Sequence, residues 1–168
     1  MFTGKEIDNI KKLSEEKSDE NWKFRTFLKG CDEKKIDRIV HRLYREISSE
    51  IDCNACANCC REISPVLKEK DIKRLSRGLK ISDDLFEKKY LIKRENNEEY
   101  IFNKKPCPFL SGNLCSAYLY RPDDCRLYPH LHKKDFIFRL IDVIDNCSVC
   151  PIVFNVYERL KDEVRHNF

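Results

Sequence analysis

Four cysteines stand within eight residues of one another, at Cys53, Cys56, Cys59 and Cys60, and no other stretch is so rich in reactive side chains. Two residues between cysteines let two thiolates turn toward one metal ion or one edge of a cluster. The backbone between them can then donate N–H groups to sulfur. The pattern predicts a protein that binds metal through cysteine.

The candidate ligands extend well beyond this first stretch. Five more cysteines follow in the C-terminal half of the chain, and we predict that nine of the ten bind metal: Cys53, Cys56, Cys59, Cys60, Cys107, Cys115, Cys125, Cys147 and Cys150. Cys31 has no cysteine neighbour at ligand spacing, so we expect a small buried or surface residue there.

Nine thiols are one more than two four-thiolate sites need, so either one thiol is spare or a histidine replaces another. His130 and His132 follow Cys125 closely and are the candidates, although exposed loop histidines are the preferred interpretation. His41 and His166 lie in predicted helices and receive no role. The side chains of adjacent residues point in different directions, so Cys59 and Cys60 are hard to place on one metal. One of the two therefore binds a second metal, acts as a bridging ligand, or is simply buried.

Zinc is one interpretation of these spacings. A zinc ion takes four thiolates or imidazoles in a tetrahedron, and cysteines separated by two residues are a common half of such a site. Cys53 with Cys56, and Cys147 with Cys150, could each supply one half.

An iron–sulfur cluster, of the four-iron kind (4Fe-4S), is the other interpretation. Three cysteines two residues apart with a remote Cys-Pro pair are similar to a ferredoxin arrangement, and both Cys107-Pro108 and Cys150-Pro151 offer that pair. The adjacent Cys60 departs from the ferredoxin spacing, so only the ligand chemistry carries over. The crowding of thiols beyond one zinc ion's need favours iron–sulfur, and both metals remain open.

Cations near the thiolates form a further set of candidates. A cluster of thiolates is anionic, and nearby positive charges stabilise it and set its potential. Equally, these side chains could be surface charges that cover Tyr118, Tyr120 and Tyr128 with their stems. The candidates are Arg121, Arg126 and Lys133.

One amphipathic helix delivers the first four cysteines. Apolar residues at steps of three and four from Ile36 to Ile51 predict a helix over residues 33–51 that ends directly before Cys53. Pro106 and Pro108 hold Cys107 in a rigid loop. The other predicted elements are one or two helices within 5–30, a helix over 65–78 capped by Ser64, a helix over 82–91, a hairpin around 95–98, a turn at 111–113, a short helix over 122–128, a strand over 136–141 and a helix after Cys150.

The size of the chain, 168 residues, is that of one domain. Hydrophobic residues make up 41% and charged residues 37%. We predict a mainly helical α+β fold, a small cysteine-rich domain centred on metal, with a short hairpin and flanking amphipathic helices. The single domain spans 1–168, with a helical segment over 1–51, a metal-binding core over 52–151 and a C-terminal helix over 152–168.

The charge balance gives no clear sign of a nucleic-acid partner. The net charge of +4 comes from 33 basic and 29 acidic residues, and helix faces of mixed sign explain so small an excess. No apolar run suits a signal peptide or a membrane span, so we expect a cytoplasmic protein. In that reducing compartment, ten cysteines indicate metal rather than disulfides.

Four motifs in order resemble the YkgJ family of cysteine-cluster proteins, described as a zinc- or iron-chelating domain. They are the CxxCxxCC stretch from Cys53, the run PCPFL at 106–110, CxxY from Cys115, and RPxxCRxYP at 121–129. The resemblance covers about residues 50–151. It implies cluster positions at the first four cysteines and at Cys107, Cys115 and Cys125, with Cys147 and Cys150 in a less uniform part.

Three hypotheses follow for function. The first is an iron–sulfur protein, with zinc as well, in redox or electron-transfer work. The second is a structural zinc module whose helices bind a protein or nucleic acid. The third is a protein-modifying enzyme or maturation factor, because flagellin lysine N-methylases carry the same cysteine signature. That link covers the cluster alone, no glycine-rich loop for adenosylmethionine is present, and the sequence indicates no catalytic residue.

Overall fold

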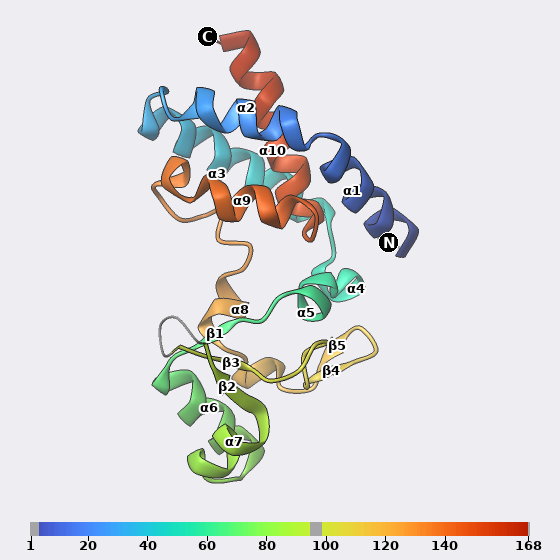
Figure 1. Cartoon of the computed structure of the whole chain (residues 1–168), viewed down its shortest axis with the longest axis vertical. Coiled ribbons are helices and arrows are strands. Elements are labelled where there is room, and N and C mark those ends of the chain that lie inside the picture. The colour runs from blue at the N-terminus through green and yellow to red at the C-terminus, as the bar shows by residue number, and fades with distance from the viewer. Residues whose placement is uncertain (1–3, 95–98, 168) are drawn as a thin grey trace. The chain divides into compact units, whose positions relative to one another are not determined.

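The computed structural model describes residues 4–94 and 99–167. Its contacts divide the chain into two compact units (Figure 1). Unit 1 comprises Met1–Cys56 and Pro129–Phe168, and unit 2 comprises Ala57–Tyr128. Helices dominate, and the described strands form two small sheets in unit 2, so the predicted mainly helical α+β class is confirmed. The single domain stays a prediction.

Unit 1 is helical throughout its described part. Its elements are α1 (Gly4–Glu16), α2 (Ser18–Leu28), α3 (Glu33–Glu50), α4 (Cys53–Cys56), the 3-10 turn η2 (Phe136–Arg139), α9 (Leu140–Cys147) and α10 (Pro151–Asn167). The helices predicted within 5–30, over 33–51 and after Cys150 are confirmed. Pro151 opens α10, where the missing proline N–H would have had no partner in any case.

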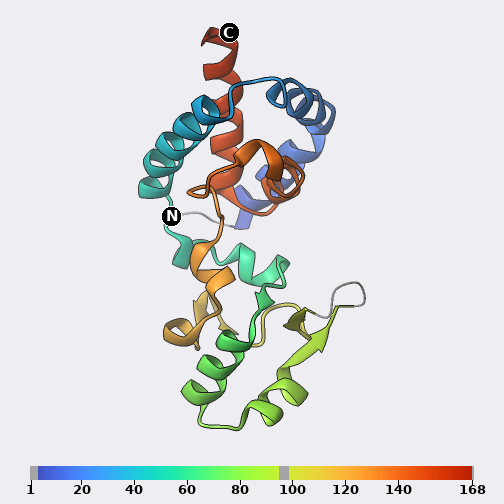
Figure 2. The ribbon, with the colours of Figure 1, turned by 90° about the vertical axis from the view of Figure 1, so that its left-hand side faces the viewer.

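The core of unit 1 lies between α3 and α10, which pack side by side (Figure 2). The Asp32 side chain caps α3 by accepting a hydrogen bond from the Lys35 N–H at 2.6 Å. The apolar stripe of α3 is buried at Ile36, Val40, Leu43 and Ile47. Tyr157, Leu160 and Val164 of α10 are fully buried.

The strand predicted over 136–141 is wrong. This stretch forms η2 and the first turn of α9, because the buried carboxylate of Asp37 accepts hydrogen bonds from the Asp135 and Phe136 N–H groups at 2.9 and 3.0 Å. Those contacts cap the turn from a distant helix. Leu140, Val143 and Ile144 are then buried at helical spacing.

Unit 2 combines short helices with two antiparallel sheets. Its elements are α5 (Asn58–Glu62), β1 (Val66–Leu67), α6 (Glu69–Leu79), α7 (Asp83–Tyr90), β2 (Leu91–Lys93), β3 (Tyr100–Phe102), β4 (Leu110–Ser111), β5 (Leu114–Cys115), the 3-10 turn η1 (Tyr118–Tyr120) and α8 (Asp123–Leu127). One sheet has the order β1-β3-β2, and β4 pairs with β5.

The hairpin of β2 and β3 is confirmed, while its predicted turn at 95–98 lies outside the described residues. The turn at 111–113 is also confirmed, with Gly112 in the left-handed region at φ 61°. The α7 helix begins after Ser82, whose side chain accepts from the Leu85 N–H, and α8 is the short helix predicted over 122–128.

The predicted start of the helix over 65–78 is wrong. Val66 and Leu67 form β1 and pair with Ile101 and Tyr100 of β3, so the helix begins only at Glu69. Pairing with a strand that lies far along the chain outweighs the local cap predicted at Ser64-Pro65.

The core of unit 2 is an apolar cluster around Phe109, whose ring lies 5.0 Å from the ring of Tyr90 and 5.5 Å from that of Phe102. Cys107 and Cys115 pack against this cluster. No helix within the described ranges is long and apolar enough to cross a membrane.

Candidate metal centres

Unit 1 holds two pairs of cysteines at helix ends. Cys53 and Cys56 bound α4, which begins where the Asp52 side chain accepts from the Asn54 N–H at 2.9 Å. Cys147 ends α9 and is 1% exposed. Cys150 precedes α10, and its carbonyl accepts from Phe154 N–H at 3.0 Å in the first turn of that helix.

Tyr44 of α3 interacts electrostatically with one cysteine of each pair. Burial raises the pKa of the Tyr44 hydroxyl, and the thiols of Cys53 and Cys150 raise it further. Burial also raises the pKa of Cys53, followed by the effects of Cys56 and Asp52. Tyr44 is therefore within electrostatic reach of one cysteine from each pair, a role that its sequence position did not reveal.

In unit 2, the loop between β3 and β5 positions Cys107 and Cys115. The tilted and edge-to-face ring contacts of Phe109 with Tyr90 and Phe102 hold the loop on the core, and the Cys107 N–H donates to the Cys60 carbonyl at 2.8 Å. Burial raises the pKa of Cys107 to about 11, while hydrogen bonds from the Phe109 and Leu110 backbone act in the opposite direction. The Leu110 N–H also donates to the Cys107 carbonyl at 3.0 Å, which holds the backbone of this loop in a turn.

Cys59 and Cys60, adjacent on α5, have different surroundings. A hydrogen bond from the Cys59 side chain lowers the pKa of Cys60 to about 7, against the effect of burial and with help from Arg61. The Cys60 thiol in turn adds to the raised pKa values of Cys107, Cys115 and Cys125. It is therefore close to the other thiols of unit 2, with Cys59 as a hydrogen-bond donor beside it.

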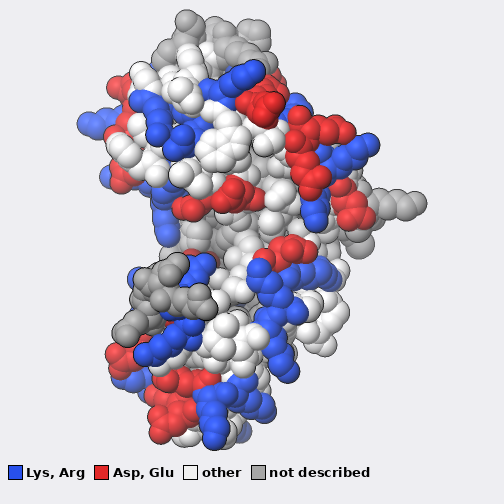
Figure 3. Space-filling view, in the orientation of Figure 1, with Lys and Arg blue, Asp and Glu red and all other residues white. Residues whose placement is uncertain are grey.

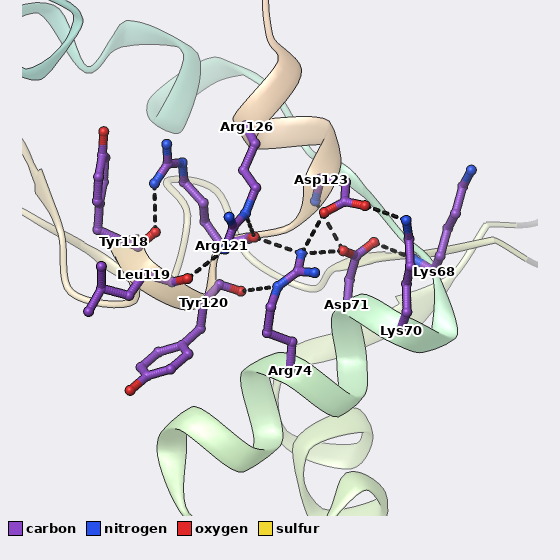
Figure 4. Close-up of polar contacts among 10 residues, drawn as sticks. All are labelled: Lys68, Lys70, Asp71, Arg74, Tyr118, Leu119, Tyr120, Arg121, Asp123 and Arg126. Atoms are coloured by element: carbon purple, nitrogen blue, oxygen red, sulfur yellow. Dashed lines mark hydrogen bonds and ion pairs between the residues drawn. The ribbon is translucent and has the colours of Figure 1, made fainter.

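An ionic network centred on the buried Asp71 carboxylate holds α8, which carries Cys125, against α6 (Figure 4). The Asp71 carboxylate is 1% exposed and accepts from the N–H groups of Lys68 and Asp123, each at 3.0 Å. Arg74 bonds Asp71 at 2.5 Å and Asp123 at 2.9 Å. One carboxylate therefore caps the starts of both α6 and α8.

Among the described residues, few cations offset negative charge on the thiols of unit 2. Burial raises the pKa of Cys125, and the thiols of Cys107, Cys60 and Cys115 add to the shift. Arg121 acts in the opposite direction on Cys115. Four thiolates gathered here would be stable only with a cation among them, and this is the chemistry that a bound metal supplies.

The donor chemistry of both sets fits a metal. All ten cysteines are free thiols. Among the described residues, however, no three cysteine sulfurs lie within 4.8 Å of one another. Sulfurs around one tetrahedral zinc ion stand about 3.8 Å apart. Side chains must therefore close in to hold a single ion, whereas an iron–sulfur cluster accepts thiolates that are farther apart.

Of the predicted cations, Arg121 shows features of both roles considered. Arg121 lies over the Tyr118 ring at 3.7 Å. Burial raises the pKa of Cys115, and the charge of Arg121 opposes that rise. Arg126 instead donates to the carbonyls of Arg121 and Leu119. Arg61 is a cation that sequence reasoning missed, although it directly follows Cys60.

The remaining predicted candidates lie in unit 1. The carbonyls of His130 and Lys133 accept hydrogen bonds from Arg139. The exposed His132 ring stands 6.3 Å from the ring of Tyr44. Cys31, left without a role, donates weakly to the Phe27 carbonyl at 3.6 Å.

A comparison with known families matches residues 52–151 to the model described as "CxxCxxCC: Putative zinc- or iron-chelating domain". The matched range contains all nine predicted ligands. No curated protein and no solved structure matches the chain.

Proposed function

Because the chain belongs to the CxxCxxCC family of zinc- or iron-chelating domains, we propose that each unit binds its own metal through its own cysteines. The observation that carries the proposal is the division of the nine thiols. Unit 1 has Cys53, Cys56, Cys147 and Cys150, and unit 2 has Cys59, Cys60, Cys107, Cys115 and Cys125.

Zinc suits the thiols of unit 1. Two pairs with two intervening residues, each at a helix end, have the ligand spacing of structural four-cysteine zinc sites. The second pair joins α9 to α10, so a zinc ion there would tie α4 to the corner between these helices. Its contribution would be to folding.

An iron–sulfur cluster suits unit 2. Cys60, Cys107, Cys115 and Cys125 would hold it, and hydrogen bonds from Cys59, the backbone after Cys107 and the Ala117 N–H would surround the sulfurs. Arg61 and Arg121 would offset part of the negative charge. Such hydrogen bonds and charges set the reduction potential of a cluster, which supplies one-electron transfer.

Metal analysis of anaerobically purified protein tests this allocation. We expect one zinc, four iron and four sulfide per chain, with visible thiolate-to-iron absorbance, as the proposed 4Fe-4S cluster requires. Cys147→Ser should remove zinc and leave iron. Cys125→Ser should remove iron and leave zinc, and Cys31→Ser is the matched control that should keep both.

Two results would contradict the proposal. Colourless protein with two zinc ions would support the structural zinc module instead. Loss of both metals in each single variant, with helix content preserved by circular dichroism, would show one shared site.

A further inference from the structure

A basic groove of about 910 Å³ runs along the outer face of α3 in unit 1. Its floor is α3, and its sides include His132 and Glu163 of α10. No thiol lines the groove, although one of its lining residues, Tyr44, is within electrostatic reach of Cys53 and Cys150. The metal-binding proposal therefore leaves this groove without a role.

Four cations of α3 line the groove at steps of three, four and three residues: Lys35, Arg38, Arg42 and Arg45. This spacing places them on one face of the helix, over about 15 Å of its length. The lining contains one carboxylate, Glu163. The groove therefore carries a local positive charge that the chain's net charge of +4 does not reveal.

Two of these cations are available to a ligand. Arg42 is held by Glu163 and by Glu46, the latter at 3.0 Å. The side chains of Arg38 and Arg45, in contrast, form no hydrogen bond or ion pair with any described residue, and both are exposed. They stand about 10 Å apart along the helix axis.

Two aromatic rings lie at one side of the groove. The rings of Tyr44 and His132 are 6.3 Å apart and tilted by 39°. Burial lowers the pKa of His132, and His130, Lys133, Arg139 and His41 lower it further. A ring surrounded by cations favours an anionic ligand with a planar group, because arginine binds phosphate and aromatic rings stack on bases.

Figure 3 shows how charged side chains are distributed over one face of the molecule. On the face drawn in Figure 3, Lys and Arg side chains stand among Asp and Glu. Such mixing is the ordinary state of a protein surface and indicates no ligand. The sequence showed no clear sign of a nucleic-acid partner because the whole-chain charge balance, on which that interpretation rested, cannot report a local groove.

We propose that the basic groove of unit 1 binds a nucleotide, with Arg38 and Arg45 on phosphate groups and the rings of Tyr44 and His132 against the base. The nucleotide has two sources with the same chemistry, a free mononucleotide or one residue of a single-stranded nucleic acid. The proposal does not depend on which metal the cysteines hold.

Binding to full-length, metal-loaded protein tests the proposal with two probes. One is adenosine diphosphate, which offers two phosphate groups, followed by calorimetry, and the other is a labelled oligoadenylate of about ten nucleotides, followed by fluorescence anisotropy. Binding of the mononucleotide as tight as that of the oligomer identifies a free nucleotide. Much tighter binding of the oligomer identifies a single strand.

The double variant Arg38→Gln with Arg45→Gln should weaken binding at least about tenfold. With the oligomer, the slope of log K against log salt should fall by about 1.4, since each lost phosphate contact contributes about 0.7. Arg77→Gln with Lys88→Gln removes the same charge from exposed positions of unit 2 and should change neither quantity.

The aromatic part has its own variants. Tyr44→Leu should weaken binding, while Tyr44→Phe, which keeps the ring, should bind as the parent does. Circular dichroism and metal content confirm that each variant is folded. The proposal is overturned if neither probe binds at low salt, or if the groove and control double variants bind equally.

Discussion

Replacing Asp71 by alanine is expected to lower the free energy of unfolding of unit 2 by about 4 kcal/mol, the range for breaking a buried ion pair. The carboxylate is 1% exposed and serves three donors. Two are the N–H groups of Lys68 and Asp123, each costing about 1–2 kcal/mol when left buried without an acceptor. The third is Arg74, which retains Asp123 and two backbone carbonyls and so adds about 1 kcal/mol.

Hydrogen exchange with mass spectrometry measures this loss where it should occur. Amides of α6 and α8 that exchange through opening of unit 2 should exchange about a thousandfold faster, since about 1.4 kcal/mol corresponds to a factor of ten. Asp71→Asn keeps an oxygen acceptor, so its amides should exchange at rates between those of the parent protein and those of Asp71→Ala. Iron content should fall with Asp71→Ala, because α8 carries Cys125.

Glu69→Ala is the matched control on the same helix. Glu69 is 81% exposed and pairs with Lys73 on the surface, so its loss should cost less than about 0.5 kcal/mol. If the amides of α6 and α8 exchange as slowly in Asp71→Ala as in Glu69→Ala, the Asp71 carboxylate does not hold these helices together.

Three further predictions concern other positions. Gly78→Ala should lower the free energy of unfolding by about 1–3 kcal/mol, and with it the melting temperature, because the new Cβ would lie 2.4 Å from the Tyr120 ring. The same change should cost less in a Tyr120→Ala background. Asp37→Ala should destabilise unit 1 by about 2 kcal/mol in urea unfolding followed by the single tryptophan, since two N–H groups at η2 lose their acceptor, and an unchanged midpoint would contradict this. The hydrogen bond from Arg42 lowers the pKa of Glu46. The stabilisation that this hydrogen bond gives to the fold is therefore present above the ordinary glutamate pKa and is lost as the pH falls through the lowered pKa. Glu46→Gln should therefore lower the urea midpoint at pH 7, and this loss should shrink as the pH falls through the lowered pKa; a loss that stays the same across the acid range would refute the linkage.

The parts of the fold that were predictable from sequence depend on local patterns. The α3 stripe repeats at helical spacing over the whole element, and Asp32 caps it from an adjacent position. Pro151 and Ser82 similarly mark the starts of α10 and α7 within their own segments. In each case the residues that determine the element lie inside it or beside it.

The errors arose where distant residues decide the backbone. The acceptor that caps η2 comes from Asp37, 98 residues before Asp135, and an apolar run alone cannot show this. Val66 and Leu67 likewise become a strand only because β3 offers them a partner. Local propensity is weak compared with such tertiary contacts.

The candidate site shows the same division between local and distant information. Cysteine types and spacing indicated all nine candidate ligands, but not their grouping. Ala57, at φ 49°, lies between α4 and α5 in the left-handed region, where the chain changes direction and unit 2 begins. The different surroundings of Cys59 and Cys60 also depend on segments far along the chain, above all on Cys107.

The order of the two units along the chain has a consequence for biosynthesis. Unit 2 is one continuous stretch, whereas unit 1 is built from two separate stretches. A chain leaving the ribosome therefore has every thiol of unit 2 before Cys147 and Cys150 exist, and α3 has no partner in α10 until that helix, Pro151–Asn167, has emerged. We expect the first metal to be acquired by unit 2 during translation. Cys53 and Cys56 stay as a bare pair in this interval, open to oxidation or to a mismatched metal.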